Sequence, residues 1–252
     1  MIYLVLGMHK SGTTMVARAL HESGIPMGEG FRKGASYQDL KYESGWAQGI
    51  NDAILGVGRG AFSLTVTSRC LNGDAIDDQI AGKMRAGAER FSKQFADWGF
   101  KDPRSALTYP FWRDNLPAHR LIVVYRDPLS VWRRYYRFIG WLAIRRPFAV
   151  WDDYNRRILA SLSRVEAKDV LYLSFDRLVS GREEWKRLDR FVGRELVDVC
   201  DPVQSANRFS DSLFSRLQYR VLNALAGSRV RDTYDRLNRL RLEQAGRTQD
   251  DA

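Results

Sequence analysis

The sequence predicts an α/β fold in which a central, mostly parallel sheet is flanked by helices. Short apolar runs typical of buried strands alternate with longer amphipathic segments typical of helices. This alternation favours parallel strands, because each helix returns the chain across the sheet. The 252 residues show no internal repeat and no long linker. We therefore expect a single domain over residues 1–242 and a disordered polar tail over 243–252.

The expected elements follow one another in a regular order. The strands are apolar and the first helix ends at Gly24, whereas Pro128 suits the first turn of a later helix. The expected strands are 2–6, 98–100, 121–125 and 170–175. The expected helices are 14–23, 39–55, 75–96, a stretch ending near 116, 126–138 and 149–165, with a mostly helical remainder.

Charge and composition narrow the classes of partner. The net charge of +10 favours anionic partners such as nucleotides, acidic glycans or membrane surfaces. No nucleic-acid-binding motif is present, so we expect no nucleic-acid partner. The basic segment 133–146 could contact a membrane peripherally, but no apolar run is long enough to span one. With no signal-peptide core and two widely spaced cysteines, we expect a cytoplasmic protein with free thiols.

The sequence GMHKSGTT follows the first expected strand and opens the first expected helix. Glycines let a chain curl so that several backbone N–H groups point at one ligand, and the helix N-terminus adds a partial positive charge. This segment therefore predicts a site for a tetrahedral oxyanion. The residues expected to contact the anion are His9, Lys10, Ser11, Gly12, Thr13 and Thr14.

The position of the lysine bears on which anion this is. In Mg²⁺-dependent phosphate loops the lysine follows the second glycine, whereas Lys10 precedes Gly12. The strand LIVVY ends at Arg126, and arginine offers a planar fork for phosphate rather than a metal ligand. Asp176, at the end of VLYLSFD, keeps a Mg²⁺-dependent kinase or NTPase open as an alternative.

These motifs resemble a known family. GMHKSGTT resembles the 5′-phosphosulfate loop of sulfotransferases that use 3′-phosphoadenosine 5′-phosphosulfate (PAPS), and VYRDPLSVWRRYY resembles their 3′-phosphate-binding segment. KYESGWAQGINDAIL, FKDPRSALTYPFW and VLYLSFDRL are similar to further blocks of the bacterial branch, in the same order over about residues 1–195. The resemblance implies a three-layer P-loop-like fold and a transferase that needs no metal. It would move a sulfuryl group to a hydroxyl or amine acceptor, such as a saccharide or small metabolite, and release adenosine 3′,5′-bisphosphate (PAP).

The resemblance also implies roles for the donor-binding residues. Lys10 would contact the oxygen that bridges sulfate and 5′-phosphate, and would stabilise the charge that builds there. Arg126 would bind the 3′-phosphate. The family usually has a serine eight residues after this arginine, where this chain has Arg134. Ser130 lies one helical turn earlier, so Ser130, Arg134 or both would complete the phosphate site.

The acceptor side is less clearly marked. Sulfuryl transfer is faster when a side chain takes the acceptor's proton, and family members use histidine or glutamate. We expect Glu43 to be this base, with Asp102 as its competitor. Lys101 would contact the sulfonate, and Arg104 could pair with Asp102 or with an anionic acceptor. A non-catalytic nucleotide- or polyanion-binding protein, which would lack a working base, is the other alternative.

Overall fold

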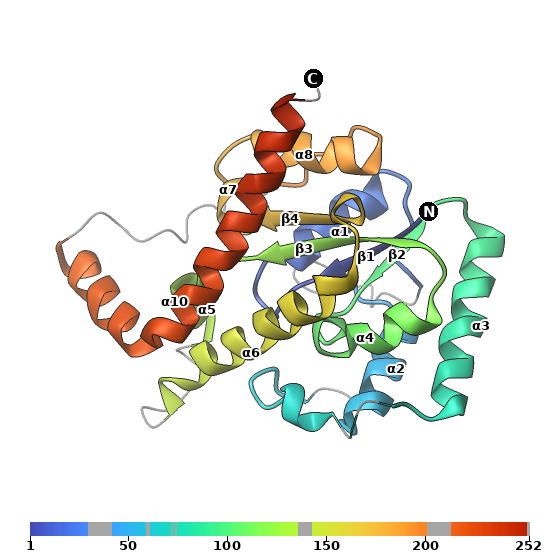
Figure 1. Cartoon of the computed structure of the whole chain (residues 1–252), viewed down its shortest axis with the longest axis horizontal. Helices are drawn as coiled ribbons and strands as arrows, with labels where there is room; N and C mark the ends of the chain where they lie inside the picture. The colour runs from blue at the N-terminus through green and yellow to red at the C-terminus, as the bar shows by residue number, and fades with distance from the viewer. Residues whose placement is uncertain are drawn as a thin grey trace, which may run out of the picture.

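The computed structural model describes residues 1–29, 42–58, 61–71, 73, 75–135, 143–200 and 213–250. At the centre of these residues lies a parallel sheet with the strand order β2-β1-β3-β4 (Figure 1). Its strands are β1 (Ile2–Leu6), β2 (Trp98–Lys101), β3 (His119–Tyr125) and β4 (Val170–Ser174). All three strand pairs are parallel, so their carboxyl ends meet at one edge of the sheet.

Helices cover both faces of this sheet. They are α1 (Thr13–Glu22), α2 (Gly45–Leu55), α3 (Asp78–Gln94), α4 (Ser105–Asn115), α5 (Pro128–Tyr135), α6 (Arg146–Ser161), α7 (Phe175–Leu178), α8 (Glu183–Val192) and α10 (Leu213–Asp250). Short 3₁₀ turns lie at Ser68–Cys70, Leu162–Arg164 and Ala167–Asp169.

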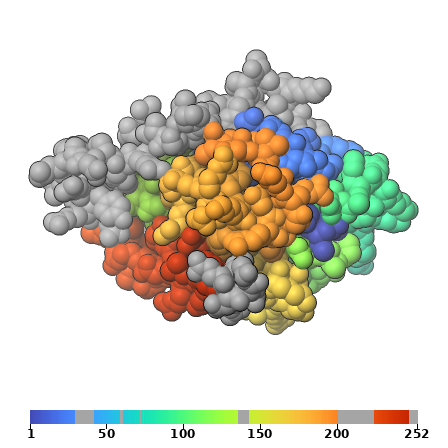
Figure 2. All heavy atoms as spheres, turned by 90° about the horizontal axis from the view of Figure 1, so that it is seen from above, coloured from blue at the N-terminus to red at the C-terminus, as the bar shows by residue number. Residues whose placement is uncertain are grey.

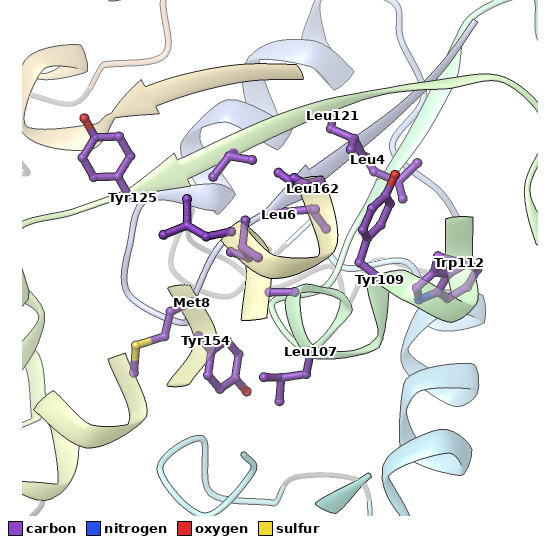
Figure 3. Close-up of a cluster of buried hydrophobic side chains, with 14 of the residues drawn as sticks. Leu4, Leu6, Met8, Leu107, Tyr109, Trp112, Leu121, Tyr125, Tyr154 and Leu162 are labelled. Carbon is purple, nitrogen blue, oxygen red and sulfur yellow. The ribbon is translucent and has the colours of Figure 1, made fainter. Parts of the chain in front are cut away.

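Alternate residues of each strand point to opposite faces, as strand geometry requires. Leu4, Leu6 and Leu121 belong to a large buried cluster with side chains of α2 to α6 and α10 (Figure 3). Val5 and Val124 face the other way, into a cluster with α1 and α8. Both faces are thus buried, and the three-layer α/β architecture expected from the sequence is confirmed.

Several helix boundaries differ from those expected, including those of α3, which runs over Asp78–Gln94 rather than 75–96. The helix expected over 39–55 begins only at Gly45, because the Ser44 hydroxyl caps it by accepting a hydrogen bond from the Ala47 N–H at 3.5 Å. Residues 39–41 lie outside the described part of the chain, as do 136–142, where the helix from 126 was expected to end. The helix expected over 149–165 runs instead from Arg146 to Ser161.

The C-terminal helix continues through the stretch expected to be a polar tail. α10 is interrupted at Gly227, where φ is 82° and ψ is 167°, and then runs on to Asp250. Its Gln244 side chain accepts a hydrogen bond from the Tyr172 N–H at 3.0 Å and donates to the Val170 carbonyl at 2.6 Å. These bonds satisfy backbone groups of β4 at the edge of the sheet, which explains why so polar a segment is anchored.

The same helix packs beside α8. Arg241 pairs with the buried Glu184, which also bonds Arg187 at 3.1 Å. The face seen in Figure 2 shows these neighbouring segments, with α7 and α8 in gold and orange and α10 in red. Neither α10 nor any other helix in the described ranges is long and apolar enough to cross a bilayer. Within the described residues, Cys70 and Cys200 form no disulfide.

Candidate active site

The segment Gly7–Gly12 turns sharply between β1 and α1. Gly12 has a φ of 94°, and a Cβ there would collide with the ring of Phe175. A Cβ at Gly7 would likewise collide with the Val124 carbonyl oxygen. Lys10 adopts a left-handed φ of 68°, an uncommon conformation for a residue other than glycine. The glycines are therefore required by close approach, and the turn opens directly onto the N-terminus of α1.

Two polar side-chain atoms of this loop are buried without a hydrogen-bond partner among the described residues. They belong to Ser11, whose hydroxyl is unpaired, and to His9, whose Nε2 is shielded from water. An unpaired buried polar group costs on the order of 1–3 kcal/mol, so such groups are expected where a ligand supplies the missing bond. The loop is thus suited to a polar ligand, as the sequence predicts.

His9 is a neutral part of this loop. Its pKa is lowered to about 3, mainly by burial, with the positive charges of Lys101, Arg104 and Lys10 adding to this effect and Asp102 opposing it. Its ring lies edge-on to that of Tyr154 on α6, with centroids 6.1 Å apart. The imidazole is therefore uncharged at neutral pH and packs between the loop and α6.

Three predicted residues from distant parts of the chain meet at the end of β2. The ammonium of Lys101, which is fully buried, donates to Glu43 Oε1 at 3.1 Å and to the Thr14 hydroxyl at 3.3 Å. The other carboxylate oxygen of Glu43 accepts from Gln48 Nε2 at 2.8 Å. Glu43 keeps 18% of its side chain exposed. Solvent, or an acceptor, can therefore reach the Glu43 carboxylate, whereas the Lys101 ammonium is shielded.

The competing carboxylate, Asp102, is held by an arginine. Its Oδ1 accepts from the Arg104 N–H at 2.8 Å and Nε at 3.0 Å, and its Oδ2 accepts from Arg104 at 2.6 Å. Burial would raise the pKa of Asp102, but the hydrogen bonds and charge of Arg104 outweigh it and lower the pKa. Arg104 also pairs with Asp52 on α2. Asp102 is a buried structural ion pair and is poorly placed to take a proton from an acceptor.

Arg126 directly follows β3, and its guanidinium is only partly satisfied by the protein. It is 5% exposed, and its Nε has no hydrogen-bond partner in the described parts of the chain. Its guanidinium carbon lies 4.5 Å from the centre of the Phe175 ring, and Nε lies 3.6 Å from Asp176 Oδ1. Burial lowers its pKa, with Asp176 opposing this effect and Arg134 adding to it by like-charge repulsion. Arg126 and Arg134 thus place two positive charges close together.

Ser130 takes part in the same region through its backbone. Its N–H donates to Asp127 Oδ2 at 2.7 Å, at the first turn of α5. Asp176, the residue that kept a metal site open in the sequence, accepts a hydrogen bond from the Asp127 N–H at 2.9 Å and pairs with Arg126. The carboxylate therefore orders the arginine and the start of α5.

Sequence reasoning missed two aromatic residues of the site. Phe175 lies against both Gly12 and Arg126, and Tyr154 lies against His9. Phe175 directly follows β4, the neighbour of β3 in the sheet. Its closeness to Arg126 could have been inferred once those strands were paired. Tyr154 gave no comparable signal, since nothing in the sequence of α6 indicates which side chain faces the loop.

The fold is an α/β architecture in which the loop 7–12, Lys101 and Arg126 follow or end neighbouring parallel strands at the carboxyl edge of the sheet. The model of the sulfotransferase family matches residues 3–198, which is most of the chain. The chain therefore belongs to the sulfotransferase family.

Solved structures agree on the fold. The chain is similar to the sulfotransferase domain from the curacin biosynthetic pathway, with 15% identity, 94% of this chain and 97% of the other covered, and a TM-score of 0.54. It is also similar to the sulfotransferase domain from the Synechococcus PCC 7002 olefin synthase, with 18% identity, coverage of 89% and 92%, and a TM-score of 0.51. A search of the curated proteins finds no match.

Proposed function

We propose that this protein transfers a sulfuryl group from PAPS to a hydroxyl or amine acceptor, such as a saccharide or small metabolite. The observation that carries the proposal is the convergence of three groups at one edge of the sheet. These groups are the loop with Lys10, the Lys101–Glu43 pair and the Arg126–Arg134 pair. A donor with phosphates at both ends of its ribose matches two separate cationic positions.

The unsatisfied polar atoms support this donor. Ser11 Oγ, His9 Nε2 and Arg126 Nε are all buried without a protein partner among the described residues, and each could bond an anionic ligand. The loop backbone and the hydroxyls of Thr13 and Thr14 would hold the 5′-phosphate. Arg126, together with Arg134 or Ser130, would hold the 3′-phosphate, where the planar guanidinium suits phosphate oxygens.

The chemistry divides between Lys10 and Glu43. PAPS supplies an activated sulfuryl group whose bond to the 5′-phosphate oxygen breaks as the bond to the acceptor oxygen or nitrogen forms. Lys10 would stabilise the negative charge left on the 5′-phosphate. Glu43 Oε1 would take the acceptor's proton, and Lys101 would hold that carboxylate in place and contact the sulfonate.

Calorimetric titration with PAP, with and without Mg²⁺ and beside ATP and AMP, tests the donor site. We expect tight binding of PAP that does not depend on Mg²⁺, and much weaker binding of AMP. A preference for Mg-ATP would instead support the kinase or NTPase alternative. PAP binding without any release of PAP from PAPS over a broad acceptor panel would support a non-catalytic nucleotide-binding protein.

A further inference from the structure

A cavity lies between the first turns of α6, the 3₁₀ turn at Ser68–Cys70 and the interruption in α10. Its volume is about 460 Å³, within the range of roughly 300–1,000 Å³ that is usual for small-molecule sites. No residue of the loop 7–14 lines it, and neither do Arg126 and Arg134. Glu43 and Lys101 do not line it either, so the cavity is separate from the residues assigned to donor binding and proton transfer.

The wall of this cavity is strongly basic. Four arginines line it, namely Arg69, Arg145, Arg146 and Arg229. Only Arg229 has a carboxylate partner among the described residues, at 2.7 Å from Asp152. The other three have no acidic side chain within ion-pair distance in the described ranges, although Arg146 Nε donates to the Leu64 carbonyl at 2.9 Å. Their guanidinium groups are thus available for an anion.

Two aspartates also line the cavity and must be included in its charge. Asp152 is held by Arg229 and by the Thr233 hydroxyl at 2.6 Å. Asp153 accepts from the Ser68 N–H at 2.7 Å and from the Ser68 hydroxyl. Both carboxylates are thus occupied by neighbouring donors. Four arginines against two aspartates leave two positive charges without compensation.

Apart from Thr67, the remainder of the wall is apolar. Phe148, Val150, Leu225 and Val230 contribute to it, beside small alanine side chains. A ligand that fits must therefore combine a charged group with an apolar body. A phosphate monoester carries roughly −1.5 to −2 charges at neutral pH, and arginine forks bind its oxygens in pairs. That charge matches the excess in the cavity, whereas a single carboxylate would compensate only half of it.

We propose that this cavity binds a small organic phosphate monoester, with the phosphate on Arg69, Arg145 and Arg146 and the organic part against Phe148 and Val150. Phenyl phosphate is a suitable probe, because it has one phosphate and one small apolar ring. The phosphate could belong to a soluble metabolite or to a lipid headgroup, and we assign it to a soluble one because a cavity of about 460 Å³ accommodates only a small organic part.

Calorimetric titration with phenyl phosphate tests the proposal. The double variant Arg69→Ala, Arg145→Ala should weaken binding at this site by on the order of tenfold or more, because each lost arginine removes a charge-assisted bond. Arg164→Ala, which removes a charge from an exposed arginine outside the cavity, is the matched control and should leave binding unchanged. Equal affinity in the wild type and in the double variant would overturn the proposal.

The donor loop could also bind phosphate, so the titration is repeated in a second background. In Lys10→Ala, Arg126→Ala protein the cavity component should remain, whatever the outcome of the PAP titration. Loss of all phenyl phosphate binding in that background would overturn the proposal, because the heat would then come from the donor site. In the same Lys10→Ala, Arg126→Ala protein, the resonance of the Arg146 side-chain N–H should shift on addition of phenyl phosphate. This measurement reports on the cavity while all of its own residues are intact.

Two further probes test the ligand class. Benzoate should bind at least about tenfold more weakly than phenyl phosphate, since it carries a single charge. Equal affinity for benzoate would overturn the assignment to phosphate. Binding to phosphatidate vesicles without binding to phenyl phosphate would overturn the assignment to a soluble ligand.

Discussion

Replacing Glu43 by glutamine isolates the proposed base from the rest of the site. Glutamine keeps the size of the side chain and an acceptor oxygen for Lys101, but it cannot take a proton. A positioned general base contributes about 10²–10⁴-fold to a rate. We therefore expect Glu43→Gln to lower kcat by about 10²–10⁴-fold, which corresponds to roughly 3–5 kcal/mol in the barrier. Because PAP does not need the base, its affinity should stay within about threefold.

The substitution also removes the counter-ion of a buried ammonium, so stability must be measured alongside turnover. Breaking a fully buried ion pair costs about 3–5 kcal/mol. Glu43 is 18% exposed, and glutamine can still accept from Lys101, so we expect a smaller loss of about 1–3 kcal/mol in the free energy of unfolding. Thr14, at 3.3 Å, still accepts from Lys101. The variant should therefore remain folded at room temperature.

The assay is the release of PAP from PAPS, first with water as acceptor and then with the fastest compound of a hydroxyl panel. Denaturant unfolding and PAP titration are carried out on the same samples. Glu29→Gln is the matched control, because this glutamate is half exposed and, within the described ranges, its ion pair is with Arg90 on α3. Turnover equal to that of the control would refute Glu43 as the base. Equal losses of turnover and of PAP affinity would instead show that Glu43 has a structural role.

Three further predictions concern the donor side. Lys10→Ala should lower turnover by at least about 10²-fold with a modest loss of PAP affinity, and turnover near the wild-type value would contradict its role. Arg126→Ala should weaken PAP by about 10–100-fold while AMP changes little, as calorimetry would show. For His9, the pKa is lower in the folded protein than in the unfolded chain. As pH falls, the unfolded chain therefore binds the proton first, and the free energy of unfolding decreases below about pH 6.5. Between pH 6.5 and 5 the wild type should lose roughly 1–2 kcal/mol more than His9→Gln in urea unfolding, and an equal pH dependence would show that His9 is not buried neutral.

The local features of the molecule could be predicted from the sequence. Each strand was expected within two residues of its observed bounds, because a fully buried parallel strand is a continuous apolar run. The loop 7–12 could also be recognised from the sequence, because its two glycines, Lys10 and Ser11 lie close together in the chain. The pairing of Arg104 with Asp102 was one of two expected alternatives, and the structure confirms it.

The long-range features could not be predicted in the same way. Glu43 and Lys101 are 58 positions apart, and no local pattern indicates that their side chains meet at 3.1 Å. The anchoring of Gln244 on β4 was missed for a related reason, because a polar helix carries no signal for which amide will satisfy a strand edge. Composition predicted disorder there, and two hydrogen bonds to the backbone of β4 oppose it.

The charged groups at the carboxyl edge of the sheet differ in whether their hydrogen bonds are made within the protein. Lys101 is fully buried, but Glu43 and Thr14 both accept its hydrogen bonds. Arg126 is almost as buried, yet its contact with Asp176 is longer, at 3.6 Å, and its Nε has no acceptor in the described part of the chain. A bound phosphate would therefore supply the hydrogen bond that Arg126 lacks, whereas Lys101 already makes its hydrogen bonds within the protein. Since a hydrogen bond to a charged group contributes about 1.5–3 kcal/mol, discrimination between PAP and AMP should depend on Arg126 far more than on Lys101.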